Sequence, residues 1–311
     1  MQTPATLQKK HNEKPSVSSQ IFTKRNLSIF LFIAPALFIY VLYVIYPIIA
    51  TFQYSFHTWN TAGDKIFVGL ENYSRLFSDS VFWIALKNNV LVILTSVFIQ
   101  IPLGLILALM LFAPIKGIRF FNSIYFLPFM VSTVATGMLW VFMFDPLDGV
   151  MNQIIGLFGV ENILWISEPS TAMFSVLFVV VWQGAPFYMI LMRAAIVGMP
   201  VELYEAAEID GANVWKRFTS ITLPLLWPTI ITSSILAIVG SLKAFDLFFV
   251  MTEGGPNGST EILGTYMFKQ AFMNYNSGYA SAIAFVMFSI ALVVTIIIQV
   301  MNHSRNGKEM L

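Results

Sequence analysis

Six stretches of about 20 mostly apolar residues limit how this chain can fold more than any other feature. They centre on residues 30–49, 90–111, 124–144, 173–197, 226–249 and 280–300. Each is long enough to cross the roughly 30 Å hydrocarbon layer of a bilayer as an α-helix. A membrane β-barrel would instead show segments of about ten residues with alternating polarity. With a mean hydropathy of +0.76 and 11% charged residues, the pattern predicts an all-α membrane protein with six transmembrane helices in one bundle.

The positions of Lys and Arg predict the orientation, because cytoplasmic loops carry more positive charge than exported ones. The loop 145–170 contains four acids (Asp145, Asp148, Glu161 and Glu168) and no Lys or Arg, as expected of an outward loop. We therefore expect both termini in the cytoplasm. This orientation places there 12 of the 17 Lys and Arg residues: Lys9, Lys10, Lys14, Lys24, Arg25, Lys116, Arg119, Arg193, Lys216, Arg217, Arg305 and Lys308.

The polar ends of the chain and its long apolar middle predict a single membrane domain. Residues 1–25 are expected to form a disordered cytoplasmic tail, since they begin with a polar run rich in Lys, Ser, Thr and Pro. Residues 26–303 form the transmembrane domain, and residues 304–311 a second cytoplasmic tail. The first apolar stretch exceeds the 7–15 residues of a signal-peptide core, which predicts a retained anchor. The chain has no cysteine, which excludes disulfides, and a net charge of +1, which gives no sign of nucleic-acid binding.

The first outward loop, residues 51–87, is rich in aromatic side chains. One interpretation is a belt of aromatic residues at the membrane interface. The other is a docking face for an external protein. The aromatic residues are Tyr54, Phe56, Trp59, Tyr73, Phe77 and Trp83.

A polar element at about residues 198–225 interrupts the apolar chain between the fourth and fifth stretches. Pro200 suits the start of a helix, and the acids that follow complement a helix N-terminus. Gly211 can adopt the left-handed conformation that ends a helix, and Asn213 can cap the next. The pattern predicts two short helices joined by a tight turn and closed by Leu223-Pro224 before the fifth span.

This polar element has two interpretations, a surface helix on the membrane and a docking element for a partner protein. Helices that lie on membranes usually carry Lys and Arg, whereas the first helix here carries acids that anionic lipids repel. A protein partner therefore fits better. The acids are Glu202, Glu205, Glu208 and Asp210.

At this element the chain resembles the permease subunits of bacterial binding-protein-dependent ABC importers. Their signature is Glu-Ala-Ala, three residues, Gly, nine residues, then Ile-x-Leu-Pro. The matching residues are Glu205, Ala206, Ala207, Gly211, Ile221, Leu223 and Pro224. Further stretches look like the carbohydrate-uptake branch, and the opening pattern looks like a maltose-type first permease. They lie at residues 34–36, 46–47, 55–56, 182–186 and 252–256, and at Thr260.

The resemblance implies the fold, location and partners of the protein. It implies the type I permease fold of ABC importers in the bacterial inner (plasma) membrane. The implied partners are a second permease in a heterodimer, two copies of a cytoplasmic ATPase, an external solute-binding protein and the surrounding lipid. The short helices would dock on the ATPase as a coupling helix, with Glu205 engaging a basic group of that partner.

Nucleotide and metal sites are not expected in this chain. No Gly-x4-Gly-Lys-Ser/Thr motif occurs, so ATP and Mg²⁺ are expected on the partner ATPase, and the chain is expected to be a transport subunit without enzymatic activity. His11, His57 and His303 are too far apart in sequence for a histidine metal centre, and no catalytic constellation is visible.

Polar and aromatic residues inside the fourth span are the first candidates for a substrate pathway, because polar groups in a membrane usually face a cavity or a partner helix. Aromatic faces and hydrogen-bonding groups suit sugars, which points to Trp182, Gln183, Phe187 and Tyr188. The resemblance implies Gln183, Gly184 and Phe187, with Ser241, Lys243 and Ala244 on the fifth span. The alternative is that Gln183 bonds a neighbouring helix while the aromatic residues pack.

Lys243 and Asp246 are three positions apart, so we expect them to share a helix face, where they can pair. A structural ion pair is one interpretation of these charges. The other is that Lys243 meets an anionic group on a sugar acid or sugar phosphate.

The sequence thus predicts a permease that moves a carbohydrate, delivered by an external binding protein, into the cytoplasm. The alternatives are a glycerol-phosphate or other polyol-type substrate in the same machine, and a self-sufficient secondary transporter. Ion-coupled carriers usually place acids inside their spans. The inner parts of these spans lack Asp and Glu, which disfavours the last alternative.

Overall fold

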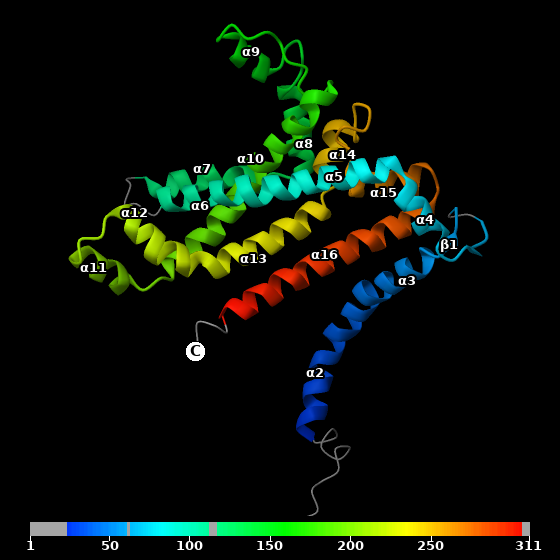
Figure 1. Cartoon of the computed structure of the whole chain (residues 1–311), viewed down its shortest axis with the longest axis horizontal. Helices are drawn as coiled ribbons and strands as arrows, with labels where there is room; N and C mark the ends of the chain where they lie inside the picture. The colour runs from blue at the N-terminus through cyan, green and yellow to red at the C-terminus, as the bar shows by residue number, and fades with distance from the viewer. Residues whose placement is uncertain (1–23, 61–62, 112–116, 307–311) are drawn as a thin grey trace, which may run out of the picture. The chain divides into compact units, whose positions relative to one another are not determined.

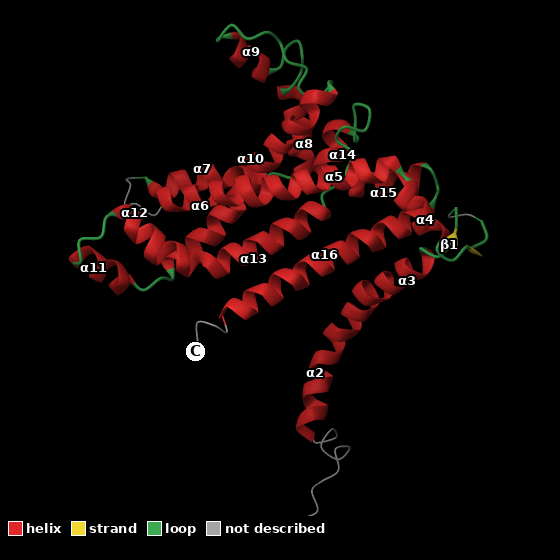
Figure 2. Ribbon diagram, viewed as in Figure 1, coloured by secondary structure: helices red, strands yellow, loops and turns green. Residues whose placement is uncertain are grey.

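The computed structural model describes residues 24–60, 63–111 and 117–306, and these are almost entirely helical (Figures 1 and 2). Residues 1–23 and 307–311, most of the two expected tails, lie outside the described residues, as does Lys116. The chain divides into two compact units, residues 1–51 and 52–311. The first unit contains α2 (Lys24–Tyr40), the π-helical turn η1 (Val41–Ile45) and the start of α3 (Tyr46–Tyr54).

The second unit holds the remaining elements. In chain order they are β1 (His57–Thr58), β2 (Ile66–Phe67), α4 (Glu71–Ser78), α5 (Ser80–Thr95), η2 (Ser96–Gln100), α6 (Ile101–Met110), α7 (Ile118–Met130), α8 (Thr133–Met143), α9 (Val150–Gly156), α10 (Pro169–Val197), α11 (Val201–Ile209), α12 (Val214–Arg217), η3 (Phe218–Thr222), α13 (Leu223–Leu242), α14 (Asp246–Thr252), α15 (Leu263–Phe268), η4 (Lys269–Met273) and α16 (Ser277–Asn306). β1 and β2 pair antiparallel, with His57 opposite Phe67 and Thr58 opposite Ile66.

Five helical segments in the described residues are long and apolar enough to cross a membrane. They are Ile29–Tyr54, Ser80–Met110, Pro169–Val197, Val214–Leu242 and Ser277–Asn302. A sixth candidate consists of two helices, Phe120–Met130 and Thr133–Met143, bent by 94°. The continuous span predicted at 124–144 is therefore broken, and the described residues contain five candidate spans, or six if the bent pair counts as one.

The break between α7 and α8 has a local contribution and a distant one. Val131 and Ser132 have extended backbones, and Pro128 already removes one helical hydrogen bond just before them. The carbonyl of Val131 is satisfied by Gln183 of α10, whose Nε2 donates to it at 3.2 Å. The Gln183 side chain thus replaces the backbone N–H that would bond to this carbonyl in a continuous helix.

Three of the four π-helical turns in the described residues stand in one fixed relation to a proline. η1 ends at Ile45, η2 at Gln100 and η3 at Thr222, in each case two residues before a proline (Pro47, Pro102 and Pro224). A proline ring collides with the carbonyl four residues before it. A turn widened to five residues moves that carbonyl aside, so these helices continue through their prolines.

The fifth predicted span, 226–249, also ends early. α13 stops at Leu242, and Phe245 turns the chain with φ −151° and ψ −65° before α14 begins at Asp246. This turn packs closely against α15 and requires glycine at position 264, because a Cβ there would lie 2.4 Å from the Ala244 carbonyl oxygen.

Two buried asparagines of α5 fasten the turn after α13 to the segment that follows it. Asn89 donates from Nδ2 to the Ser241 carbonyl and accepts from the Leu263 N–H, both at 2.8 Å. Asn88 donates to the carbonyls of Ser259 and Glu261 at 3.0 and 2.8 Å. These bonds satisfy backbone groups that the interrupted helices leave open.

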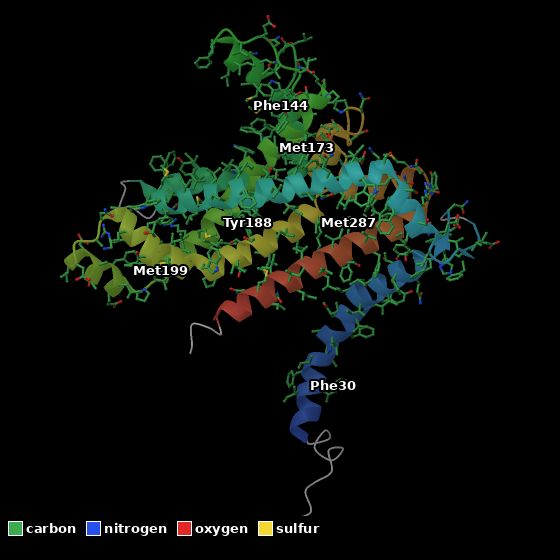
Figure 3. The ribbon with its side chains drawn as sticks, in the orientation of Figure 1. Phe30, Phe144, Met173, Tyr188, Met199 and Met287 are labelled. Carbon is green, nitrogen blue, oxygen red and sulfur yellow. The ribbon has the colours of Figure 1, made fainter. Side chains whose placement is uncertain are left out.

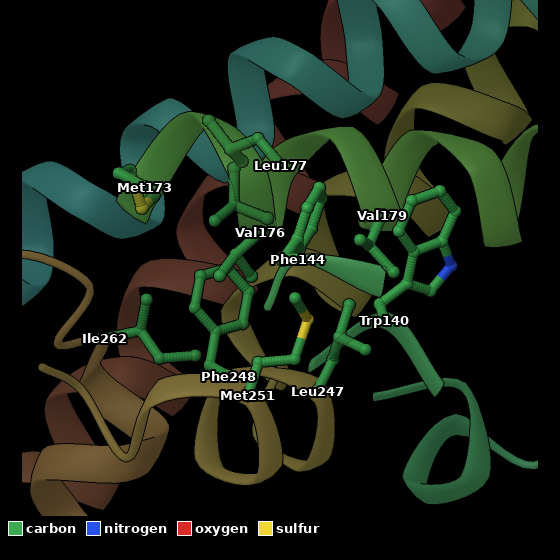
Figure 4. Close-up of a cluster of buried hydrophobic side chains, with 11 residues drawn as sticks. Trp140, Phe144, Met173, Val176, Leu177, Val179, Leu247, Phe248, Met251 and Ile262 are labelled. Carbon is green, nitrogen blue, oxygen red and sulfur yellow. The ribbon is translucent and has the colours of Figure 1, made fainter. Parts of the chain in front are cut away.

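The two breaks create a compact apolar cluster at one end of the bundle (Figure 4). α8 and α14 approach closely at Gly137, where a Cβ would lie 2.9 Å from Val250 Cγ1. Phe144 and Met173 lie in the upper part of the view, and Met199 lies at the left, where the chain passes from α10 to α11 (Figure 3). The cluster consists of Val92, Trp140, Phe144, Met173, Val176, Leu177, Val179, Leu247, Phe248, Met251 and Ile262.

The packing of α4, α5, α15 and α16 against one another centres on one carboxylate, that of Asp79. It caps α5 by accepting from the Val81 N–H at 2.9 Å, and its Oδ2 accepts from the hydroxyls of Tyr266 and, at 2.6 Å, Tyr279. Burial opposes ionisation of Asp79, but these hydrogen bonds together hold its pKa below the ordinary value. Burial, with the bond to Asp79, raises the pKa of Tyr266 to about 12, so it remains a donor.

The first outward loop carries an aromatic cluster of its own. Lys65 Nζ lies 4.2 Å from the ring centre of Tyr54 and 4.5 Å from that of Trp59. Trp83 donates from Nε1 to the Phe77 carbonyl at 2.9 Å. These contacts hold the aromatic side chains in place and leave both interpretations of the loop as predictions.

We expect Asp79→Asn to lower the free energy of unfolding by roughly 1–2 kcal/mol at neutral pH, because a charged acceptor of two tyrosine hydroxyls is lost. A carboxyl with a lowered folded-state pKa stabilises the fold above its unfolded pKa, and this contribution disappears as the pH falls through the folded pKa. The difference between wild type and variant should therefore shrink below about pH 4. Thermal unfolding in detergent, followed by tryptophan fluorescence, measures it. The exposed Asp148→Asn is the control, and an equal loss there would contradict the assignment.

Candidate functional site

A cavity of about 340 Å³ opens among α5, η2, α10 and the break between α13 and α14. Phe129 and Thr133 border it from the break between α7 and α8. Its lining residues are Val92, Ser96, Gln100, Phe129, Thr133, Val180, Gln183, Gly184, Phe187, Tyr188, Ala237, Gly240, Ser241, Lys243, Ala244, Phe245, Asp246, Leu247 and Phe248.

Seven of the eight residues predicted for a substrate pathway line this cavity. They are Gln183, Gly184, Phe187, Tyr188, Ser241, Lys243 and Ala244. The eighth, Trp182, is not in the lining: its ring packs edge-on against Trp140, with ring centres 5.4 Å apart. The structure thus brings residues of the fourth and fifth spans together, while their contact with a substrate stays a prediction.

Gln183 is both a cavity residue and a tie between helices. Its Nε2 donates to the Val131 carbonyl and to Thr136 Oγ1, each at 3.2 Å. The alternative stated for this residue, a hydrogen bond to a neighbouring helix, is therefore present. The side chain is held in a fixed position at the cavity wall, because its donor group is already engaged.

Sequence reasoning missed Ser96 and Gln100, which enter the cavity wall from the π-helical turn η2. Gln100 donates from Nε2 to the Val180 carbonyl at 2.8 Å. This approach requires glycine at position 184, where a Cβ would lie 1.9 Å from that same nitrogen. Ser241 donates to Ser96 Oγ at 3.3 Å. A glutamine inside an apolar run, two residues before Pro102, was the available signal.

The predicted pair of Lys243 and Asp246 is wrong. Lys243 caps the end of α13 and Asp246 is the first residue of α14, so the two do not share a helix face. Among the described residues the ion pairs are Arg217–Glu208 and Lys269–Glu261, and neither involves these two side chains. Both residues are exposed and line the cavity, which gives it one cationic and one anionic group at the same mouth.

The cavity combines aromatic faces with fixed hydrogen-bonding groups. Phe129 and Phe187 stack at 5.3 Å between ring centres, and Tyr188 packs edge-on against Phe187 at 5.2 Å. Apolar walls with a few placed polar groups are the usual make-up of a small-molecule site. No three His, Asp or Glu side chains within the described part of the chain are close enough together to hold a metal ion.

The polar element forms a helical hairpin at the far end of α13 from this cavity (Figure 1). Gly211 has φ +73°, the left-handed conformation predicted for it. Asn213 caps the next helix by accepting from the Lys216 N–H at 2.8 Å. Arg217 pairs with Glu208 at 3.2 Å across the turn.

The signature residues Glu205, Ala206 and Gly211 are exposed on this hairpin, and Ala207 and Ile221 are half-buried. Apolar side chains beside them are also open: Ile209 is 87% exposed and Trp215 is 71% exposed. An exposed surface that mixes large apolar groups with acids is typical of a docking site for another protein.

One part of the predicted hairpin needs correction. α12 is not a separate short helix closed by Leu223-Pro224; it continues through η3 into α13, so that Val214–Leu242 is one helical segment. Leu223 donates its N–H to the Phe218 carbonyl five residues earlier. The wide turn removes the clash that Pro224 would cause in an α-helix.

Comparison with known proteins gives the family. Residues 100–306 match the family described as binding-protein-dependent transport system inner membrane component. The trehalose/maltose transport system permease protein MalF of Thermococcus litoralis is 37% identical over 86% of this chain and 91% of its own length. The diacetylchitobiose uptake system permease protein NgcF of Streptomyces coelicolor is 33% identical over 89% of this chain and 83% of its own.

Solved structures give the same fold. A bacterial ABC transporter involved in the import of the acidic polysaccharide alginate matches with a TM-score of 0.80 at 23% identity, over 92% of this chain and 98% of the other. The family match and the two relatives agree with each other. The chain therefore belongs to the inner membrane components of binding-protein-dependent transport systems, the permease subunits of ABC importers.

Proposed function

We propose that this permease moves a carbohydrate, delivered by an external binding protein, across the bacterial inner membrane into the cytoplasm. The observation that carries the proposal is the cavity itself, which combines stacked aromatic rings with the amides of Gln100 and Gln183. Relatives named for maltose, diacetylchitobiose and lactose transport support the substrate class. The bound complex of the alginate transporter with its periplasmic protein supports the external partner.

The remaining parts of the machine follow from the hairpin. Glu205, Ala206, Ala207 and Gly211 form the surface that meets a cytoplasmic ATPase, and two copies of that ATPase hold the ATP and Mg²⁺. A second permease subunit completes the transport pathway, as the resemblance of the signature residues implies. Both termini and the hairpin lie on the cytoplasmic side, in agreement with the distribution of Lys and Arg.

A glycerol-phosphate or polyol-type substrate is the second candidate, because Lys243 lines the cavity without an ion-pair partner among the described residues. An exposed ammonium would attract a phosphate or carboxylate. Asp246 at the same mouth would repel that anion, which favours the neutral sugar.

The docking surface is tested by Gly211→Asp. We expect at least a tenfold loss of sugar uptake and of co-purified ATPase, because a side chain is strained at φ +73° and adds charge to the surface. Gly258→Asp is the matched control, since Gly258 has φ +74° and equally open surroundings but lies between α14 and α15, away from the hairpin. Unchanged uptake and ATPase recovery in Gly211→Asp would refute the assignment.

The substrate class is tested by Lys243→Gln. Uptake of a neutral sugar should remain within about threefold of wild type, since an exposed amine is replaced by a hydrogen-bonding amide. Uptake of radiolabelled maltose and of glycerol 3-phosphate in the same cells measures both classes. Selective loss of glycerol 3-phosphate uptake would establish the second candidate in place of the first.

A further inference from the structure

The long helical segment Val214–Leu242 connects the two functional regions directly. Its first turn carries Arg217, which pairs with the docking hairpin. Its last turns carry Ala237, Gly240 and Ser241, which line the cavity. A helix rises about 1.5 Å per residue, so α13 alone spans roughly 30 Å between them. Whatever fixes the hairpin to the start of this segment also determines how the hairpin moves the cavity wall.

A hydrogen bond between side chains fixes that connection. The Tyr204 hydroxyl of α11 and Thr222 Oγ1 at the end of η3 lie 3.0 Å apart, and Tyr204 also donates to the sulfur of Met199 at 3.1 Å. Thr222 is only 5% exposed and Tyr204 is half-buried, so this bond is partly shielded from water. The Arg217–Glu208 pair is weaker, because the Glu208 side chain is 75% exposed.

The wide turn η3 sets the rotation of α13 about its own axis relative to the hairpin. One residue of an α-helix corresponds to a rotation of about 100°. The extra residue accommodated by a π-helical turn therefore rotates the cavity-lining end of α13 by that amount relative to the hairpin. Pro224 maintains the wide turn, since its ring would collide with a carbonyl in regular α-geometry.

We propose that Tyr204, Thr222 and Pro224 are positioning residues that make the docking hairpin and α13 move as one rigid body. This inference rests on the proposed function. It assigns a task to the Leu-Pro end of the signature: Pro224 sets the rotation between hairpin and cavity, and the Tyr204–Thr222 bond prevents the hairpin from moving independently. A displacement of α11 then moves Ser241 and the cavity wall by the same rigid-body motion.

The hydrogen bond is tested in the assembled importer reconstituted in liposomes. Tyr204→Phe and Thr222→Val should each lower the number of maltose molecules transported per ATP hydrolysed by about fivefold, the effect of losing one partly buried hydrogen bond. The double variant should be no worse than either single variant, and Thr222→Ser should retain wild-type coupling. Thr219→Val is the control, because Thr219 lies in the same turn but bonds only to carbonyls of its own helix.

Two outcomes would overturn this part of the proposal: additive losses in the double variant, or an equal loss in Thr219→Val. ATPase co-purification should remain at the wild-type level in all of these variants. Loss of co-purification in Gly211→Asp and loss of coupling in Tyr204→Phe are separate results, so failure of the proposed function and failure of this inference can be distinguished.

The role of Pro224 is tested by Pro224→Ala in the full chain in nanodiscs. We expect the wide turn to return to α-geometry and the distance between spin labels at Glu202→Cys and Leu236→Cys to change by several ångströms. Pro228→Ala is the matched control. Pro228 lies in the same helix, but no π-helical turn directly precedes it as η3 precedes Pro224. An unchanged distance in Pro224→Ala would refute the role given to this proline.

Discussion

Every backbone polar group in the hydrocarbon layer needs a partner from within the protein, and the rest of this structure depends on how that requirement is met. The chain breaks two of its apolar stretches and places prolines within helices, and each interruption frees carbonyl or N–H groups. Amide side chains replace the lost partners. Gln183 donates to the Val131 carbonyl. Asn89 donates to the Ser241 carbonyl and accepts from the Leu263 N–H. The few polar residues of the spans therefore mark the places where the helices are interrupted.

The same interruptions build the candidate site. The cavity lies where α13 stops and η2 widens, so its wall includes backbone turns as well as side chains. Gln100 has both roles: it donates a hydrogen bond to the Val180 carbonyl and it lines the cavity. A substrate would meet polar groups that the membrane fold already requires, held by bonds that do not depend on the substrate.

The sequence predicted the apolar stretches and the two helices on either side of Gly211, because these depend on local composition and spacing. Together with the family resemblance it also named seven of the nineteen residues that line the cavity. Gly211 and Asn213 behave as their residue types predict. Reasoning failed where a distant segment decides the local structure. The break at Val131 depends on Gln183, some 50 residues away in the chain. The continuity of η3 with α13 depends on a widened turn, which residue preferences do not distinguish from a helix end at Leu223-Pro224.

The asparagine pair of α5 has a consequence for the order in which the molecule assembles. Asn88 and Asn89 belong to an early helix, yet their partners lie at Ser241, Ser259, Glu261 and Leu263. A chain synthesised from its N-terminus inserts α5 long before those partners exist. Until then these two amide side chains lack their partners, which costs free energy near the membrane, and only the last third of the chain supplies the partners. A truncated chain that stops before Leu263 would therefore be a natural target for membrane quality control, even with most of its spans already inserted.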